Sequence, residues 1–268
     1  MDVFELVAGA QRDYLRDAVV HAAHRLRDAA PTRRLRKLHE AMAVLGIDPA
    51  ALPPDRPMAS GGWGSLAEAI RADRPLPEDP GSLAAFHAHL HEIGEEPARE
   101  LWRRLAPLRG PLLDLGGGTG AYTKAFLAQF PGETAILADR PEVLALAHVP
   151  ARAALLPLDL LNMQPPGGQG IVLLANVLHL FGRPQIEHIV RRAEAALGPG
   201  GMLVIKDLRS DTEEGVLFAL NMALYTEAGD VHPLEILEQS LRVAGLRDVR
   251  RSALESSPKS LVLTASKP

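Results

Sequence analysis

The sequence has no cysteine, few aromatic residues (4%) and no long hydrophobic run. Without cysteine the chain can form neither disulfides nor thiolate metal sites, and it cannot use a cysteine nucleophile. No stretch reaches the roughly 18 apolar residues of a membrane span, and Met1 is followed by Asp2 and Glu5 rather than by a basic leader segment. We therefore expect a cytoplasmic protein without a membrane partner.

Positive charge is not in excess either. The formal net charge is −4, which argues against nucleic acid as the main partner. The basic run 33–37 is the exception, and apolar residues recur at helical spacing through and beyond it, at Leu35, Leu38, Met42 and Leu45. We interpret the run as the solvated face of an amphipathic helix. A chain of 268 residues with 47% hydrophobic content can bury a sizeable core in about one or two domains.

Residues 1–106 show helical periodicity interrupted by proline-rich loops. We predict an all-helical N-terminal region there, acting as a lid or a dimerisation region. Its first helix is expected to end before Pro31. Ser82 is expected to cap a helix over 83–93, Gly94 to end that helix, and a further helix to run over 96–105.

From 107 to 268, short apolar runs alternate with helical segments, which is typical of a parallel sheet covered on both faces. Strands are predicted at about 111–115, 134–138, 153–158, 170–175, 201–206, 246–251 and 260–265. Helices are predicted at about 120–130, 141–148, 184–197, 213–227 and 233–244, with a glycine-rich stop at 198–201. We therefore expect a single α/β domain over these residues.

A glycine cluster follows the first predicted strand. Gly116, Gly118 and Gly120 remove Cβ atoms, so the backbone can adopt positive φ and a ligand can lie against the main chain. The spacing also satisfies a loose dinucleotide fingerprint. At this point the pattern predicts a nucleotide-like ligand without identifying it.

Acidic residues fall where other strands of this sheet are predicted to end, and ligands of open parallel sheets lie at those ends. Asp139 comes nineteen residues after Gly120 and can accept both hydroxyl hydrogens of a ribose, from NAD or from S-adenosylmethionine. Asp159 can accept the exocyclic amine of an adenine, with Leu160 packing on the ring face. These residues therefore favour an adenosyl ligand.

Three segments taken in order narrow the choice: 114–121 with the glycine cluster, 173–181 with Asn176 and His179, and 197–207. Together they resemble the class I S-adenosylmethionine-dependent methyltransferases, in particular the O-methyltransferases typified by plant caffeate and bacterial polyketide enzymes. The resemblance covers roughly 82–268. It implies a Rossmann-like seven-stranded sheet in the order 3-2-1-4-5-7-6, with S-adenosylmethionine as cofactor and S-adenosylhomocysteine as product.

The resemblance also implies the activity: O-methylation of an acidic hydroxyl, a phenol or enol, on a small molecule, in secondary metabolite biosynthesis such as that of polyketides. His179 matches the family's histidine base, and an imidazole with a pKa near 6.5 suits such acceptors. Asp114 can offset the ammonium of the cofactor. The expected cofactor-binding residues are Asp114, Gly116, Gly118, Gly120, Asp139, Arg140, Asp159, Leu160 and Asn176.

The chain departs from the family pattern around the base. The plant enzymes have a lysine where this chain has Ala175, and a carboxylate that orients the histidine where it has Val231. His232, Asp207 or Asn221 could replace that carboxylate, and the choice stays open. The N-terminal region is also shorter than in the plant enzymes, without a clear winged-helix pattern, so a homodimer is only one possibility.

The acceptor pocket is expected to be lined by Phe86, His87, Leu90, Phe218, Met222 and Tyr225. The alternation of His87, His89 and His91 invites a metal interpretation, but only the first and last share a helix face, so we expect no metal site.

Other functions stay open: C- or N-methylation, another use of the same cofactor, a NAD-dependent oxidoreductase, or a non-catalytic binding protein. The glycine spacing, Asp159 and the absence of a Tyr-x-x-x-Lys pair argue against the oxidoreductase.

Overall fold

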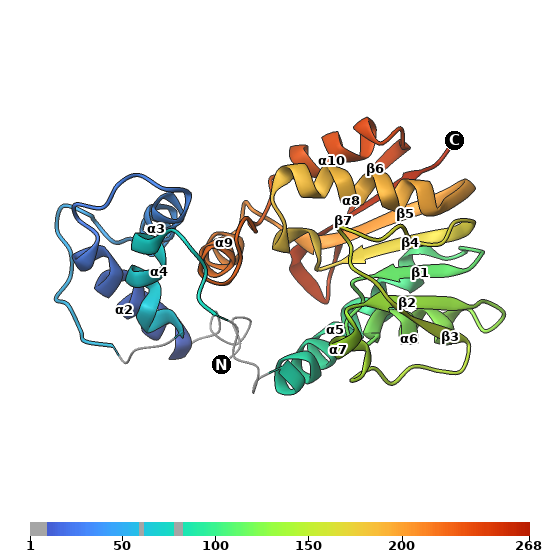
Figure 1. The fold of residues 1–268 in the computed structure, drawn as a ribbon, viewed down its shortest axis with the longest axis horizontal. Helices are drawn as coiled ribbons and strands as arrows, with labels where there is room; N and C mark the ends of the chain where they lie inside the picture. Colours follow the sequence, from blue (N-terminus) through green and yellow to red (C-terminus); the bar gives the residue numbers. More distant parts are fainter. Residues whose placement is uncertain (1–9, 59–61, 78–82) are drawn as a thin grey trace. The chain divides into compact units, whose positions relative to one another are not determined.

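The computed structural model describes residues 10–58, 62–77 and 83–268 (Figure 1). These residues form two compact units. The helical unit takes residues up to 78 together with 179–182 and 209–232, and the sheet unit takes the rest. The sequence predicts a division at 106/107. The long helix α5 (Leu83–Leu105) instead groups with the sheet unit because it packs on α6 (Ala121–Gln129), and α9 (Glu213–Tyr225) groups with the helical unit.

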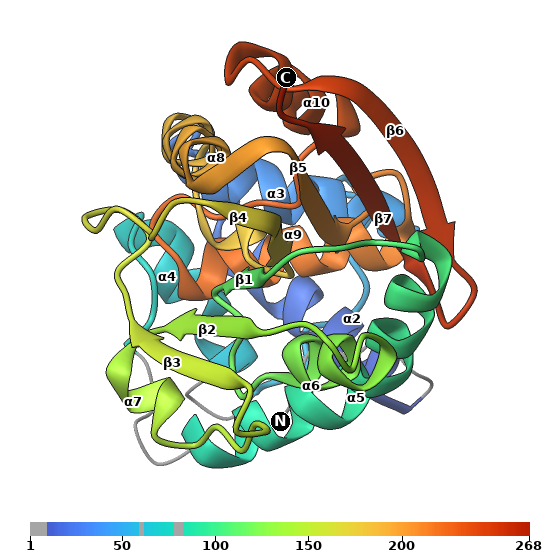
Figure 2. The same cartoon turned by 90° about the vertical axis from the view of Figure 1, so that its right-hand side faces the viewer.

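The sheet unit contains a seven-stranded sheet in the order β3-β2-β1-β4-β5-β7-β6 (Figure 2). Strand β7 runs antiparallel to both of its neighbours, and the other pairs are parallel. The predicted strand order is confirmed. The strands are β1 (Leu112–Leu115), β2 (Ala135–Asp139), β3 (Ala153–Pro157), β4 (Gln169–Ala175), β5 (Leu197–Leu208), β6 (Arg247–Leu254) and β7 (Ser257–Ser266).

Helices cover both faces of this sheet. On one face α6 packs against β1, β2 and α5, and on the other α8 (Arg183–Ala196) packs against β4 and β5, with α10 (Leu234–Val243) beside it. Trp102 and Phe126 make an edge contact at 5.1 Å in the core under α5 and α6, and the Trp102 indole donates to the carbonyl of Tyr122 at 2.8 Å. The short α7 (Pro141–Leu144) lies after β2 and covers only half of the predicted helix 141–148.

The predicted stop at Gly94 is wrong, because α5 runs unbroken through Gly94 and Pro97. A Cβ on Gly94 would lie 3.5 Å from the Cβ of Ala121, so the missing side chain lets α5 lie close to α6 rather than ending it. Burial of residues 97, 98, 101 and 102 then outweighs the hydrogen bond that a proline removes. Ser82, the predicted cap, lies outside the described residues.

The glycine-rich stop predicted at 198–201 is also different in the structure, where it lies inside β5. The pairing of β5 with β4 jumps from Leu197 opposite Gln169 to Met202 opposite Ile171, so the strand accommodates the extra residues as an irregularity. Gly201 lies close to the neighbouring strand, and a Cβ there would be 2.9 Å from the carbonyl oxygen of Gln169.

The helical unit is built from α2 (Ala10–Arg25), α3 (Arg33–Val44), the 3₁₀ turn η1 (Gly62–Ser65), α4 (Leu66–Ala72) and α9. Residues 1–9, where the first helix was expected to begin, lie outside the described residues. Thr212 caps α9 by accepting from the amide of Gly215 at 3.0 Å, and Leu217, Leu220 and Leu224 bury α9 in the core of this unit. No helix within the described ranges is long and apolar enough to cross a membrane.

The basic run at the start of α3 is solvated only in part, with Arg36 exposed as predicted. The apolar residues of the helix are buried as predicted, but Arg34 is buried as well, at 3% exposure. Its guanidinium donates to the carbonyls of Ala223 and Thr226 at 2.8 and 2.9 Å and pairs with Asp73 at 3.0 Å. The amphipathic pattern could not show that α9 would present unpaired C-terminal carbonyls at this point.

Candidate functional site

The glycine turn after β1 has the conformation that the sequence predicted. Gly116, Gly118 and Gly120 have φ of +70°, +60° and +89°. Packing alone requires glycine at 116, where a Cβ would lie 2.7 Å from a methyl of Val177. At Gly118 the nearest atom to a Cβ would be Nδ1 of His87, at 3.7 Å. The turn is therefore closely packed around Gly116 and less crowded around Gly118.

Asp114 lies beneath this turn, fully buried. Its Oδ2 accepts from the hydroxyl of Thr123 at 2.8 Å, while its Oδ1 has no hydrogen-bond partner among the described residues. Burial, and then the nearby charge of Asp139, raises the pKa of Asp114 to about 7. A buried carboxyl group with an unsatisfied oxygen is the group that a bound cation would stabilise.

Asp139 ends β2 and holds the turn. Its Oδ2 accepts from the amide of Gly118 at 2.8 Å, and its Oδ1 accepts from the amide of Arg140 at 2.7 Å. Each carboxylate oxygen has a second lone pair left for a ligand hydroxyl. Arg140 itself pairs with Glu142 at 3.3 Å across an exposed surface. The carboxylate of Asp139 therefore already occupies one backbone amide of the turn.

Asp159 and Leu160 follow β3. Both carboxylate oxygens of Asp159 are engaged locally, by the amide of Leu161 at 2.8 Å and the side-chain amide of Asn162 at 2.7 Å, and the bond from Asn162 lowers its pKa. Asp159 thus shapes its own turn, and its role toward adenine stays a prediction. Leu160 does reach the glycine turn, with a methyl 3.5 Å from where a Cβ of Gly116 would lie.

Asn176 follows β4 with φ +55°, and its side-chain oxygen accepts from the ammonium of Lys206 at 2.8 Å. Lys206 is buried, and burial lowers its pKa to about 8 although Asp207 opposes this. Lys206 is not among the site residues predicted from the sequence. One charged residue at the end of the apolar stretch 202–205 was the signal that could have found it, since a buried lysine needs a specific partner.

Two histidines of α5 contact the glycine turn. His87 lies against Gly118, and His91 places Nδ1 2.8 Å from the hydroxyl of Thr119 and Nε2 3.1 Å from the ammonium of Lys124. From the sequence, His87 is expected in the acceptor pocket and His91 is assigned no role. The described residues contain no group of three or more His, Cys, Asp or Glu side chains arranged for a metal.

His179, the predicted base, belongs to the helical unit in the single turn η3 (Leu178–Leu180). It is 6% exposed. Its imidazole makes an edge-to-face contact with the ring of Phe218 on α9, with the ring centroids 5.0 Å apart and the ring planes at 85°. Its carbonyl accepts from the amide of Asp230 at 2.9 Å. Gly229 makes this approach possible, because a Cβ there would lie 2.6 Å from the same carbonyl oxygen.

The three candidates for orienting His179 are placed differently. His232 donates from Nε2 to the carbonyl of Phe181 at 2.8 Å, so it braces the chain just after His179. Asn221 is buried on α9, and its side-chain oxygen has no hydrogen-bond partner within the part of the chain that the structure describes. Asp207 belongs to the sheet unit, where its Oδ1 accepts from the amide of Leu208 at 2.8 Å. The assignment of the orienting residue stays a prediction.

The predicted pocket residues are divided between the units. Phe86, His87 and Leu90 lie on α5, where Phe86 is 47% exposed and its ring centroid lies 5.5 Å from that of His87. On α9 of the helical unit, Phe218 and Met222 are buried and Tyr225 is half-buried. Burial raises the pKa of Tyr225. Each half of the predicted pocket is thus carried by one helix.

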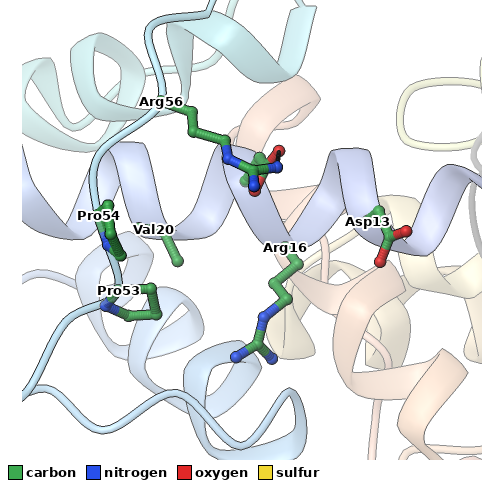
Figure 3. Close-up of a pocket in the computed structure, with 7 residues that line it drawn as sticks. Asp13, Arg16, Val20, Pro53, Pro54 and Arg56 are labelled. Atoms are coloured by element: carbon green, nitrogen blue, oxygen red, sulfur yellow. Dashed lines mark hydrogen bonds and ion pairs between the residues drawn. The ribbon is translucent and has the colours of Figure 1, made fainter.

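A cavity of about 380 Å³ lies within the helical unit, between α2 and the 53–56 segment (Figure 3). Its two arginines are already engaged: Arg56 pairs with Asp17 at 3.1 Å, and Arg16 donates to the carbonyl of Leu45. Charge is balanced within the lining, so we assign the cavity no ligand. The lining residues are Asp13, Arg16, Asp17, Val20, Pro53, Pro54 and Arg56.

Comparisons with known proteins identify the family. The family model of the O-methyltransferase domain matches residues 83–242. Acetylserotonin O-methyltransferase of Bos taurus is 31% identical over 218 residues, covering 70% of this chain and 62% of that protein. The 3-hydroxy-5-methyl-1-naphthoate 3-O-methyltransferase of Streptomyces sahachiroi is 28% identical over 213 residues, covering 70% of this chain and 61% of that protein. This chain therefore spans about three-fifths of the length of these relatives.

Solved structures share the fold. An O-methyltransferase family 2 protein from Planctomyces limnophilus, in complex with apigenin, superposes with a TM-score of 0.72 at 21% identity, covering 96% of this chain and 93% of that one. Human N-acetylserotonin methyltransferase, in complex with S-adenosylmethionine, gives a TM-score of 0.66 at 23% identity, covering 76% of this chain and 66% of that one. With most of the chain matched by the family model, this protein belongs to the O-methyltransferase domain family.

Proposed function

We propose that the protein is an S-adenosylmethionine-dependent O-methyltransferase acting on an acidic hydroxyl, a phenol or enol, of a small molecule. Family membership supports O-methylation, and the names of the relatives indicate small-molecule acceptors, acetylserotonin and a hydroxynaphthoate. The unsatisfied buried carboxyl group of Asp114 beneath the glycine turn is the observation that supports this cofactor most strongly.

The turn fits an ammonium better than a pyrophosphate. Asp114 and Asp139 bring two carboxyl groups to it, and the amide of Gly118, which a phosphate oxygen would need, already donates to Asp139. Repulsion would therefore disfavour the diphosphate of NAD, whereas the ammonium of a methionine group would supply the partner that Asp114 lacks. The residues fit S-adenosylmethionine and disfavour the dinucleotide alternative.

In this proposal the residues of the sheet unit hold the cofactor: Asp114 the ammonium, Asp139 the ribose hydroxyls, and Leu160 with Asp159 the adenine. When bound, S-adenosylmethionine supplies a methyl group already activated on a sulfonium. The chain is left to align the acceptor and to remove its proton. His179 does the second task, accepting the hydroxyl proton at its imidazole, while the contact with Phe218 limits rotation of the ring.

Calorimetry with S-adenosylhomocysteine and NAD tests the cofactor. We expect binding of the first and not of the second, and failure to bind S-adenosylhomocysteine at millimolar concentration would reject the proposal. The acceptor class is tested by offering phenols and enols with labelled S-adenosylmethionine and locating the methyl group by NMR. A methyl ether is expected, whereas a C- or N-methyl product would move the function to the alternative class.

The base is tested by His179→Ala. Turnover should fall by roughly 10²- to 10⁴-fold while the affinity for S-adenosylhomocysteine stays unchanged. Phe218→Leu is the matched variant: it keeps an apolar contact, retains the base, and should reduce turnover far less. Unchanged turnover in His179→Ala would remove the assignment.

A further inference from the structure

We propose that His91 is a positioning residue, which in its neutral form ties the glycine turn to α5 and to Lys124, so that protonation of His91 loosens the turn and weakens cofactor binding in acid. The inference rests on the proposed function, because the turn is the cofactor site only if that function holds. It goes beyond that function by adding a residue that neither the strand ends nor the glycine pattern includes.

The contacts determine the tautomer of His91. A lysine ammonium only donates, so the 3.1 Å contact between the ammonium of Lys124 and Nε2 assigns Nε2 as the unprotonated nitrogen that accepts. The carboxylate of Glu95 lies farther from the same nitrogen, at 3.8 Å. The proton is then on Nδ1, which donates to the hydroxyl of Thr119 at 2.8 Å. The hydroxyl of Thr119 accepts this bond, so its own proton is directed away from His91. One imidazole thus joins the ammonium of α6 to the glycine turn.

The position of His91 on α5 supports a bracing role. His87, His91 and Gly94 are spaced i, i+4, i+7 and lie on one face of the helix. They meet Gly118, Thr119 and Ala121 in the same order, at the turn and the start of α6. His91 hydrogen-bonds both the turn and the helix after it.

The charges around His91 give the pH dependence its sign. Burial and then Lys124 lower the pKa of His91, Glu95 on the same helix opposes this, and His148 in the segment after α7 lowers it further. The ring is therefore neutral near pH 7. Acid would place an imidazolium 3.1 Å from an ammonium and remove the acceptor of Lys124. Protonation leaves the donor on Nδ1 in place, so it is repulsion from Lys124 that displaces the ring from the turn. The bracing is therefore present above the ordinary histidine pKa and lost as the pH falls below it.

Two amide variants separate the two bonds. In His91→Asn the side-chain amide takes the place of Nδ1 and can still donate to Thr119, whereas in His91→Gln it takes the place of Nε2 and can still accept from Lys124. Neither variant titrates. Asp114 also titrates near neutral pH but is present in every variant, so differences between variants report His91 alone.

The experiment is calorimetry with S-adenosylhomocysteine at pH 7.5 and 5.5. We expect His91→Gln to bind about tenfold more weakly than wild type at pH 7.5, the loss of about one hydrogen bond, and His91→Asn to bind within about threefold. Between the two pH values the wild type should lose about tenfold more affinity than either variant. Thr119→Val should remove the difference between wild type and His91→Gln, and the exposed His39→Asn should behave as wild type.

NMR of the ligand-free protein gives a readout independent of the cofactor. Long-range ¹H–¹⁵N spectra should show His91 with its proton on Nδ1 at pH 7.5, the signal being assigned by its absence in His91→Asn. A proton on Nε2, or equal pH dependence in wild type and both variants, would overturn the proposal. Wild-type protein that binds no S-adenosylhomocysteine at either pH would instead reject the proposed function, while the NMR result would still decide whether the bracing exists.

Discussion

Replacing Arg34 by methionine should destabilise the helical unit selectively. The side chain of Arg34 is 4% exposed and makes four hydrogen bonds, to the carbonyls of Ala223, Thr226 and Asp73 and to the carboxylate of Asp73. Two of those carbonyls belong to the last turn of α9 and the residue after it, where a helix leaves its oxygens unpaired. Methionine keeps much of the volume but supplies no donor.

The magnitude follows from these contacts. Each buried carbonyl left without a donor costs about 1–3 kcal/mol, and the lost pairing with Asp73 adds little because that carboxylate is half exposed. Removing the guanidinium also removes the free-energy cost of burying a charge, which offsets part of this loss of stability. We expect the free energy of unfolding to fall by about 3 kcal/mol.

The two tryptophans make the effect measurable in one unit at a time. Trp63 is buried in the helical unit and Trp102 in the sheet unit, and the sequence contains no other. In a Trp102→Phe background, urea unfolding followed by fluorescence reports the helical unit, and in a Trp63→Phe background it reports the sheet unit. Arg34→Met should shift the first transition and leave the second within about 0.5 kcal/mol.

Arg36→Met is the matched control, since Arg36 lies two positions along α3 and is exposed. It should change neither transition by more than about 0.5 kcal/mol. If Arg34→Met shifts the Trp63 transition no more than Arg36→Met does, the clamp on α9 contributes nothing. A shift of both transitions by equal amounts would contradict the assignment of its contacts to one unit.

Three further predictions concern the sheet unit. Burial alone would raise the pKa of Glu100, but hydrogen bonds from Ser256, Glu255 and Arg104 lower it to about 2. Glu100→Gln should therefore lower the free energy of unfolding at pH 7, measured in urea, by about 2 kcal/mol after discounting for solvent. The difference from wild type should shrink as the pH falls from 4.5 toward 2. Asp114→Asn should weaken S-adenosylhomocysteine binding by about tenfold or more in calorimetry, because it removes the charge that pairs with the ligand ammonium. It should not lower the melting temperature, because it removes a buried carboxylate; a lower melting temperature would show that the carboxylate stabilises the fold. Lys206→Met should leave stability within about 1 kcal/mol but weaken the same binding, since Asn176 loses its donor; unchanged affinity would make the pair structural only.

The sequence predicted all seven strands, and the ends of β1 to β4 to within one residue, because local and global signals agree there. Apolar runs define β1 to β5, and Asp114, Asp139 and Asn176 had to fall at the carboxyl edge once those strands were parallel. The strand order came from the family resemblance, since periodicity alone does not distinguish one order of parallel strands from another. Errors occurred where a local signal was overruled by packing, as at Gly94, which is a close-contact residue rather than a helix stop.

The residues that the sequence analysis missed share a physical cause. Arg34, Lys206 and His91 are polar residues whose partners lie far along the chain: Ala223, Asn176 and Thr119. Composition and periodicity describe which face of an element is apolar, but they contain no information about which carbonyl or hydroxyl will face a given side chain after folding. A cation in an apolar or amphipathic segment indicates that some partner exists, because burying it alone is unfavourable. Only the fold identifies that partner, and in His91 the partner's identity also determines which nitrogen bears the proton.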